Sequence, residues 1–535
     1  MSPTNPLTFL KYYKCIVIGF LAITLGACAT PNSESAFSRA GKPEIIDGID
    51  VTYMANVIRE GFEEIRDRSL EQPDIDGLFT AALHELKSID IATNVLIDDE
   101  HITIAIGDGE PVRIGEVPHG DVNLWTARSI HAVLVARRHS DKFLHADYED
   151  YFRALFDGAL STLDRFSRYS DRKAAARNRL MRNGVMGLGV RVEAIPVGAL
   201  VQAIVSDGPA SSAGVLINDL IVSADGVALK DMSEQEMVRL LDGDAEGAVT
   251  LNIRRPGEKG LVTLSVKRQL IVPDTVSARV SDGIVELKIR GFNQRTSQAV
   301  EDTFNSMRAE LDEPVKGLIL DLRGDPGGLL DQAISLADLF LDRGSISDLR
   351  GRHPAANQSY RASRGDISDG VPMVVIVDGR AASASEILAA ALQDNGRAVV
   401  VGTVTLGKGS VQTIVRLPNN GEMALTWSRA ATPRGVGLHG LGILPDICLS
   451  GQVAPASEVI SELFVAPNPM VDYRARWLNP PEGRQGNDMV LRGECPAETR
   501  TERTLDLEIA RRIVSDPVLL SIAVPENSDQ LAVSP

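Results

Sequence analysis

The sequence has no excess of positive charge and few histidines, and each shortage restricts the function of the protein. Its formal net charge is −17 over 535 residues, whereas binding to a polyanion needs clustered Lys and Arg, so we expect no nucleic-acid partner. Among the eight histidines, His131, His139 and His145 lie close together, but their spacing matches no standard zinc site. We therefore predict no metal centre, and no motif implies an organic cofactor.

The sequence also lacks a long apolar run at its N-terminus. The apolar run at residues 15–25 is too short for a comfortable membrane-spanning helix, and it follows Lys11 and Lys14, as in an export signal. The run continues into Leu25-Gly26-Ala27-Cys28, which resembles a bacterial lipobox. In a lipobox the cysteine, here Cys28, is lipidated and becomes the mature N-terminus. The alternative is a soluble secreted protein that is cleaved nearby.

We predict a lipoprotein-type signal peptide at residues 1–28 and a polar, flexible tether at residues 29–46. Residue 29 is Ala rather than Asp, so the signal that retains such lipoproteins at the inner membrane is missing. In a Gram-negative cell, this pattern predicts a periplasmic protein that its lipid anchor holds to the outer membrane.

The chain is too long for a single hydrophobic core and predicts three or four domains. Apolar residues at helical spacing predict a mainly helical N-terminal domain at residues 47–184. Within it, residues 101–106 and 112–114 flank a glycine-containing turn and predict a small hairpin.

The stretch from Pro372 to Gln412 organises the second half of the chain. It predicts a buried strand, a tight turn, a short apolar helix, a second buried strand and a loop. Strands that are apolar on both faces and joined by a helix indicate a parallel sheet, which usually mounts its chemistry at the carboxyl ends of the strands. The turn offers Ser383 and Ser385 there, and the loop offers Lys408.

A serine hydroxyl needs a base to become a nucleophile. No histidine lies between Ser383 and Lys408, so the sequence favours a lysine whose pKa burial lowers enough to make it a base. On spacing alone, the favoured interpretation is that Ser383 is a helix N-cap and Lys408 is a solvated turn lysine.

The run S-A-S-E, followed by G-K-G-S-V-Q, resembles the signature of the C-terminal processing proteases, also called tail-specific serine peptidases. The resemblance implies that Ser383 is the nucleophile, that Lys408 is the general base and that Gln412 orients the lysine. The interval 408 − 383 = 25 is that of the family. The resemblance extends to residues 321–330 and 431–447, although Leu406 replaces the usual aromatic residue.

A glycine-rich turn, Arg323-Gly324-Asp325-Pro326-Gly327-Gly328, follows a predicted strand and precedes a helix. Such a turn exposes backbone N–H groups that suit an anion, but no Gly-Lys-Ser/Thr closes a phosphate loop. By the resemblance, Gly327 or Gly328 supplies one oxyanion-hole amide and Ala384 supplies the other.

A second resemblance, to PDZ domains, covers residues 185–271. Four motifs occur in PDZ order, beginning with a carboxylate-binding loop made of Gly187, Leu188, Gly189 and Val190. In this mode of recognition, backbone N–H groups bind the terminal carboxylate while the peptide adds as a strand. The resemblance implies partners with free, apolar C-termini.

The last part of the chain, residues 451–535, is Pro-rich and predicts one late helix at residues 505–513. Apart from Cys28, the mature chain holds only Cys448 and Cys495. In an oxidising compartment we predict that these two cysteines form a disulfide.

Together these features predict a multidomain α/β protein with a crotonase/Clp-protease-like serine protease core at residues 272–450, a PDZ domain, a helical N-terminal domain and a C-terminal extension. The predicted activity is that of an exported serine endopeptidase. A catalytically silent PDZ scaffold at the envelope and a crotonase-type acyl-CoA enzyme are the alternatives. The resemblance leaves a homodimer and an adaptor lipoprotein open as partners.

Overall fold

The computed structural model describes residues 44–205, 208–243, 247–363, 365–465, 468–478 and 489–523. It divides the chain into two units, residues 1–56 and 57–535. The described part of the first unit holds the antiparallel strands β1 (Ile45–Ile46) and β2 (Ile49–Asp50), and helix α1 (Val51–Arg68) runs across the boundary. The predicted signal peptide and Cys28 lie outside the described residues. The last residues of the predicted tether form β1.

No helix in the described part of the chain combines the length and the apolar character that a bilayer crossing requires.

The second unit begins with a helical region. Its elements are α2 (Ile75–His84), η2 (Glu85–Ser88), the sheet β3 (Thr93–Ile97), β4 (His101–Ile106) and β5 (Val112–Glu116), then α3 (Val122–His139), α4 (Asp141–His145) and α5 (Tyr148–Leu160). Its core is aromatic: the rings of Phe62 and Phe79 stack with centroids 3.7 Å apart, and Trp125 stacks on Phe79 at 5.5 Å. The predicted hairpin corresponds to β4 and β5, and β3 extends it to three strands.

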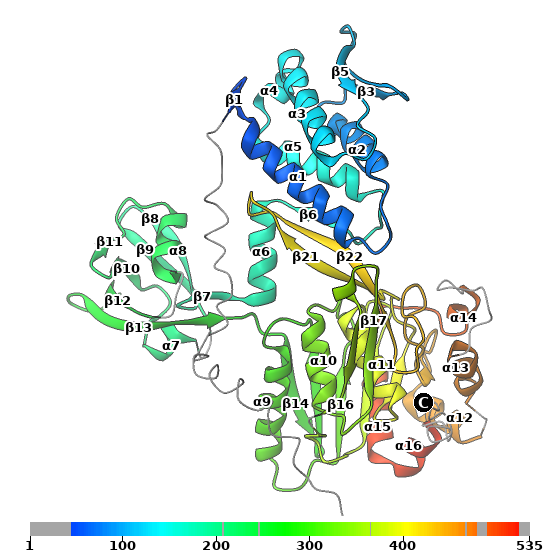
Figure 1. Ribbon diagram of the computed structural model, residues 1–535. Coiled ribbons are helices and arrows are strands. Elements are labelled where there is room, and N and C mark those ends of the chain that lie inside the picture. Colours follow the sequence, from blue (N-terminus) through cyan, green and yellow to red (C-terminus); the bar gives the residue numbers. More distant parts are fainter. Residues whose placement is uncertain are drawn as a thin grey trace, which may run out of the picture. The chain divides into compact units, whose positions relative to one another are not determined.

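Strand β6 (Arg168–Ser170) and helix α6 (Arg172–Asn183) lead into the region that resembles a PDZ domain. That region contains β7 (Val185–Gly187), β8 (Val190–Ile195), β9 (Gly198–Ile204), α7 (Pro209–Ser212), β10 (Leu220–Ala224), β11 (Val227–Ala228), α8 (Glu234–Asp242), β12 (Gly247–Arg254) and β13 (Val262–Ile271). The sheet order is β7-β13-β12-β10-β9-β8, with β11 paired to β10 (Figure 1). Helix α8 starts at a capping box in which Ser233 and Glu236 satisfy each other's backbone N–H groups.

The main sheet of the catalytic region has the order β14-β15-β16-β19-β20-β23. Its strands are β14 (Val276–Ser281), β15 (Ile284–Ile289), β16 (Gly317–Asp321), β19 (Met373–Val377), β20 (Val399–Gly402) and β23 (Ile447–Cys448). The strands from β15 onward pair in parallel, whereas β14 pairs with β15 antiparallel. β16, β19 and β20 are buried throughout, as their apolar sequences predict.

Helices cover both faces of this sheet. Helices α9 (Thr296–Ala309), α10 (Leu330–Asp338) and α11 (Ala384–Asp394) pack on one face, where Figure 1 shows α9 and α10 beside β14 and β16. A second sheet has the order β18 (Gln358–Arg361), β17 (Ser345–Arg350), β22 (Glu422–Ala431) and β21 (Ser410–Arg416). It packs against the hydrophobic core that these helices share with the main sheet, and β6 pairs with β22. Between β17 and β18 lies the short helix η3 (Pro354–Ala356).

The C-terminal extension covers the other face of the main sheet. It contains α12 (Ala456–Val465), α13 (Met470–Leu478), α14 (Met489–Gly493), α15 (Thr504–Ser515) and α16 (Pro517–Ala523), where the sequence predicted one helix. Ile509 and Ile513 of α15 share a buried cluster with Ile319 and Val374 of the sheet. The extension therefore completes the core of the catalytic region, because the apolar second face of a parallel sheet needs a covering layer.

Candidate active site

Ser383 lies between the carboxyl end of β19 and the first turn of α11. Its backbone has φ 59° and ψ −115°, a conformation that L side chains rarely adopt and that costs ~1–3 kcal/mol. Two hydrogen bonds hold the turn: the Ser383 N–H donates to Glu386 Oε2 at 2.8 Å, and the Ile387 N–H donates to the Ser383 carbonyl at 3.0 Å. The strained turn presents a half-buried hydroxyl at the edge where the sequence predicted chemistry.

Lys408 lies in the loop after β20. A Cβ on the neighbouring Gly409 would overlap the backbone of His439, so only glycine fits beside the lysine. The ammonium lies 5.2 Å from the centroid of the Phe166 ring. Burial and, to a lesser extent, the positive charge of Arg168 lower the pKa of Lys408, which favours the neutral amine that a general base needs.

The buried carboxylate of Glu386 ties the serine turn to the lysine loop. It accepts the N–H of Ser383, the N–H of Gly407 at 2.6 Å, the N–H of Lys408 at 2.8 Å and the hydroxyl of Thr405. Burial raises the pKa of Glu386, and these four donors oppose that rise. The sequence analysis missed this residue, although a Glu three positions after an N-cap serine is the usual signal for such a contact.

The side chains of Ser383 and Lys408 do not hydrogen-bond to each other or to Gln412 within the described residues. The Gln412 amide donates instead to Ser410 Oγ at 3.1 Å and to Thr426 Oγ1 at 3.2 Å. Thr426 Oγ1 in turn donates to Asp164 Oδ1 at 3.1 Å. The predicted role of Gln412 in orienting the lysine therefore stays a prediction.

The glycine-rich turn lies directly against the serine turn. A Cβ on Gly327 would stand 2.8 Å from the Ala384 nitrogen and 3.0 Å from Ser383 Cβ, so the close approach requires glycine. The Gly327 N–H donates to Asp325 Oδ1 at 2.8 Å. In the described part of the chain, neither the Gly328 N–H nor the Ala384 N–H donates a hydrogen bond. The geometry thus favours Gly328 over Gly327 as the partner of Ala384 in an oxyanion hole.

Asp325 is fully buried between these two turns. Its carbonyl accepts the Ala382 N–H at 3.0 Å and the Ser385 hydroxyl at 3.2 Å. Its Oδ2 atom has no partner among the described residues, and burial raises the pKa of Asp325 to about 7. Ser385 therefore serves the packing of the turns, whereas Ser383 is the half-buried N-cap residue of α11.

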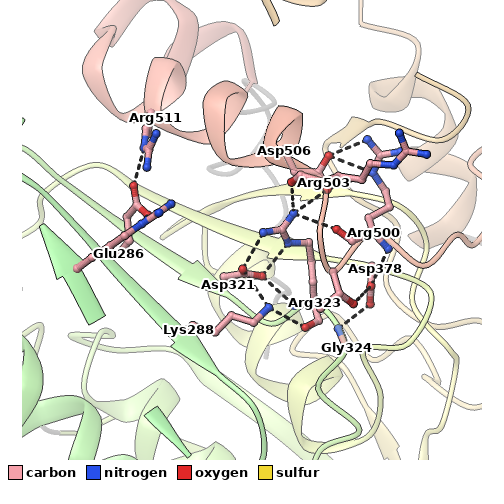
Figure 2. A network of polar contacts seen from close by, with 12 residues as sticks. Glu286, Lys288, Asp321, Arg323, Gly324, Asp378, Arg500, Arg503, Asp506 and Arg511 are labelled. Carbon is pink, nitrogen blue, oxygen red and sulfur yellow. Dashed lines mark hydrogen bonds and ion pairs between the residues drawn. The ribbon is translucent and has the colours of Figure 1, made fainter. Parts of the chain in front are cut away.

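A buried polar network continues from the glycine-rich turn into the C-terminal extension (Figure 2). Arg323 forms a bidentate pair with Asp321, at 2.9 and 2.8 Å, and also reaches Asp506 at 3.3 Å. Arg500 pairs with Asp506 at 2.7 Å. The sequence analysis missed this network, because its members lie far apart along the chain.

A cavity of about 1040 Å³ adjoins the lysine loop. Phe166, which underlies the Lys408 ammonium, lines it together with Asp164, Arg429 and His439. The His439 ring lies 6.1 Å from that of Phe166, and burial lowers the pKa of His439, so the fold brings a neutral histidine into the neighbourhood of the lysine. Its volume lies at the upper end of the range of ligand-binding clefts, about 300–1,000 Å³.

The loop predicted to bind carboxylates follows β7 and begins β8. Leu188 is fully buried and shares a cluster with Met237 and Leu241 of α8, while Gly189 has φ 73°. Burial raises the pKa of Asp242, at the end of α8, to about 6. Because Leu188 is buried against α8, its side chain forms part of the core beneath the loop.

Cys448 and Cys495 form a disulfide in the structure, with an S–S distance of 2.05 Å and Cα atoms 5.9 Å apart. The bond joins the end of β23 to the segment that leads into the polar network of Figure 2.

Comparisons with known proteins cover the same two regions. A model described as "Peptidase family S41" matches residues 283–449, and one described as "PDZ domain" matches residues 186–267. The carboxy-terminal-processing protease of Bartonella bacilliformis is 38% identical over 294 residues, or 54% of this chain and 68% of that protein. The carboxyl-terminal-processing protease of a Picosynechococcus species is 32% identical over 299 residues, or 55% of this chain and 70% of that protein. Among solved structures, the photosystem II D1 C-terminal processing protease is 28% identical and covers 61% of this chain and 93% of its own, with a TM-score of 0.34.

Proposed function

Because the chain belongs to peptidase family S41 and is a serine-type C-terminal processing peptidase with a PDZ domain, we propose that Ser383 and Lys408 perform its chemistry. Family membership confirms the resemblance, the multidomain α/β fold with a Clp-protease/crotonase-like core, and the peptidase activity predicted from the sequence. The observation that carries the residue assignment is the Glu386 carboxylate, which binds the backbones of the serine turn and the lysine loop at once.

In the proposed reaction, the neutral amine of Lys408 takes the proton from Ser383 while Oγ attacks the carbonyl carbon of the scissile bond. The oxyanion that forms receives the N–H groups of Gly328 and Ala384; losing one such donor costs ~3 kcal/mol of barrier. The lysine then passes its proton to the leaving amine, which departs and leaves an acyl-enzyme. Water, deprotonated by Lys408, hydrolyses the ester and restores Ser383.

The absence of a hydrogen bond between the Ser383 and Lys408 side chains in the described structure fits this mechanism. Catalytic hydrogen bonds are often long in unliganded enzymes and tighten only when substrate fills the site. Burial of the Lys408 side chain, whose nitrogen lies 5.2 Å from the centroid of the Phe166 ring, lowers its pKa in the structure.

We further propose that the PDZ domain selects substrates by their free C-terminal carboxylate and an apolar last side chain. Backbone N–H groups of the loop from Gly187 to Val190 would meet the carboxylate, and the apolar side of α8 would line the pocket for the side chain. Amidation of the substrate removes that charge, so it should slow cleavage at least about tenfold. Equal rates for the free acid and the amide of one peptide would contradict this proposal.

Export and anchorage are proposed from the sequence alone. We propose that residues 1–28 direct export, that Cys28 carries the lipid, and that the enzyme works in the periplasm, attached to the outer membrane of a Gram-negative cell. Labelling with a radioactive fatty acid should mark the wild-type protein but not a Cys28→Ser variant. Label in that variant would place the lipid elsewhere.

Digestion of a tagged peptide tests the catalytic assignment. Ser383→Ala and Lys408→Ala should each abolish cleavage, because the pair acts as a unit. Ser385→Ala is the matched control: its hydroxyl makes one hydrogen bond to the Asp325 carbonyl, so this variant should retain most activity. Full activity of Lys408→Ala would exclude the lysine as the base, and an inactive wild type would favour a silent PDZ scaffold.

A further inference from the structure

The Asp378 carboxylate, fully buried at the end of β19, connects three separate parts of the chain. Its Oδ1 atom accepts the N–H of Gly324 at 2.9 Å, the N–H of Arg380 at 3.0 Å and the N–H of Ala381 at 3.2 Å. Gly324 belongs to the glycine-rich turn, and the other two residues belong to the serine turn. One oxygen atom thus sets the position of the two turns that frame the oxyanion hole.

The other oxygen of Asp378 belongs to the C-terminal extension. Its Oδ2 atom accepts the N–H of Arg500 at 3.0 Å and the hydroxyl of Thr501 at 3.3 Å. Thr501 also touches the glycine-rich turn directly, because a Cβ on Gly324 would stand 3.0 Å from its Oγ1 atom. The carboxylate is therefore oriented by donors from residues more than 100 positions further along the chain.

The segment from Glu498 to Asp506 makes further bonds of the same kind. Arg323, which precedes Gly324, donates to the carbonyl of Arg500 at 3.1 Å and to that of Arg503 at 2.6 Å (Figure 2). The Gly379 N–H donates to the Glu498 carbonyl at 2.8 Å. Arg323, Arg500 and Asp506 are all fully buried, so each must keep its partners.

We propose that the segment Glu498–Asp506 is a positioning element of the active site, which holds the glycine-rich turn and the serine turn in catalytic register through Asp378. The inference rests on the proposed role of Ser383. The two turns have to present the Gly328 and Ala384 amides to one oxygen atom, and a displacement of about 1 Å at such a site costs on the order of 100-fold in rate. No contact among the described residues joins the segment to either amide, so it acts through Asp378 and Arg323.

The test compares two substitutions in the full chain with its disulfide formed. Asp378→Asn keeps the shape of the side chain but turns an NH2 group toward one of its two sets of donors. We expect kcat for a peptide amide to fall at least about 30-fold while KM changes less than about threefold. Arg511→Gln is the matched control, because Arg511 joins the same extension to Glu286 at 2.5 Å, away from both turns. Its kcat should stay within about twofold of the wild type.

A second variant keeps the proposal falsifiable should Asp378→Asn fail to fold. Thr501→Val removes only the hydroxyl that orients Oδ2, and we expect kcat to fall about three- to tenfold with KM unchanged. The affinity for a peptide boronate, which mimics the tetrahedral intermediate, should fall in parallel with kcat. Unchanged kcat in Thr501→Val, or an equal loss in Arg511→Gln, would overturn the proposal. Activity that persists in Ser383→Ala would instead refute the proposed function itself.

Discussion

The Asp325→Asn substitution should stabilise the protein, and increasingly so as the pH rises from about 4 to about 7. Asp325 is fully buried with an unpartnered Oδ2 atom, and burial raises its pKa from 3.8 to about 7. Such a rise corresponds to ~4 kcal/mol of preference for the protonated form. Asparagine keeps an oxygen for the Gly327 N–H and places a neutral NH2 group where Oδ2 stood.

The direction of this pH dependence follows from how the folded and the unfolded chain bind the Asp325 proton. Below about pH 4, Asp325 is protonated in both the folded and the unfolded chain, so the native residue carries no ionisation penalty. Between about pH 4 and pH 7 the unfolded chain loses this proton while the folded protein keeps it, so the stability of the wild type falls as the pH rises. Above about pH 7 the penalty is constant, and the variant should be more stable by up to ~4 kcal/mol.

Chemical denaturation from pH 4 to pH 9 measures the difference, with both proteins carrying Ser383→Ala to prevent self-cleavage. Asp312→Asn, a substitution at an exposed acid, is the control and should show no such trend. A stability difference that stays constant over this range, or that shrinks as the pH rises, would refute the reasoning. In the active enzyme, the ratio of kcat/KM between Asp325→Asn and the wild type should also grow above pH 7, because an ionised carboxylate beside the oxyanion turn opposes the developing negative charge.

Four further outcomes follow from the structure. Glu386→Gln should lower kcat at least about 10-fold, since an amide cannot accept from all four donors, and a normal kcat would show that the two loops hold their positions without the carboxylate. Gly327→Ala should be inactive or nearly so, because its methyl group would displace the serine turn; wild-type turnover would contradict the close approach. A pH profile of kcat/KM should level off below the pKa of free lysine, ~10.4, because burial lowers the pKa of Lys408, and a profile that still rises at pH 10 would refute that. Replacing Cys448 and Cys495 by serine should destabilise the catalytic region by roughly 2–4 kcal/mol in thermal or chemical unfolding, and equal stability would show that the bond constrains nothing.

Local patterns were enough to predict where the proposed catalytic side chains lie. The apolar strands that precede Ser383 and Lys408 are buried, parallel neighbours, so their carboxyl ends bring the two loops to one edge of the sheet, as the sequence predicted. The sequence could not show whether Gly327 or Gly328 is the better candidate for the oxyanion hole. The distinction depends on a hydrogen bond from the Gly327 N–H to the side chain of Asp325.

The polar network could not be predicted for a different reason. Arg500 and Asp506 look like ordinary surface charges in a Pro-rich tail, and only their burial against Arg323 shows their role. Periodicity identified α15 as a helix but could not identify its partner, because an apolar stripe fits any apolar face. The other helices of the extension escaped prediction, since their apolar contacts form with distant parts of the chain.

The position of the Glu498–Asp506 segment in the chain bears on when the enzyme becomes active during its synthesis. Ribosomes make Asp378 and Ser383 more than 100 residues before Arg500 and Thr501, which orient the carboxylate. A chain interrupted in between would hold both proposed catalytic side chains and a PDZ domain but leave Asp378 without these two donors. A peptidase that ends before Arg500 should therefore lack the contacts that orient Asp378, and we expect it to cleave peptides more slowly than the full chain.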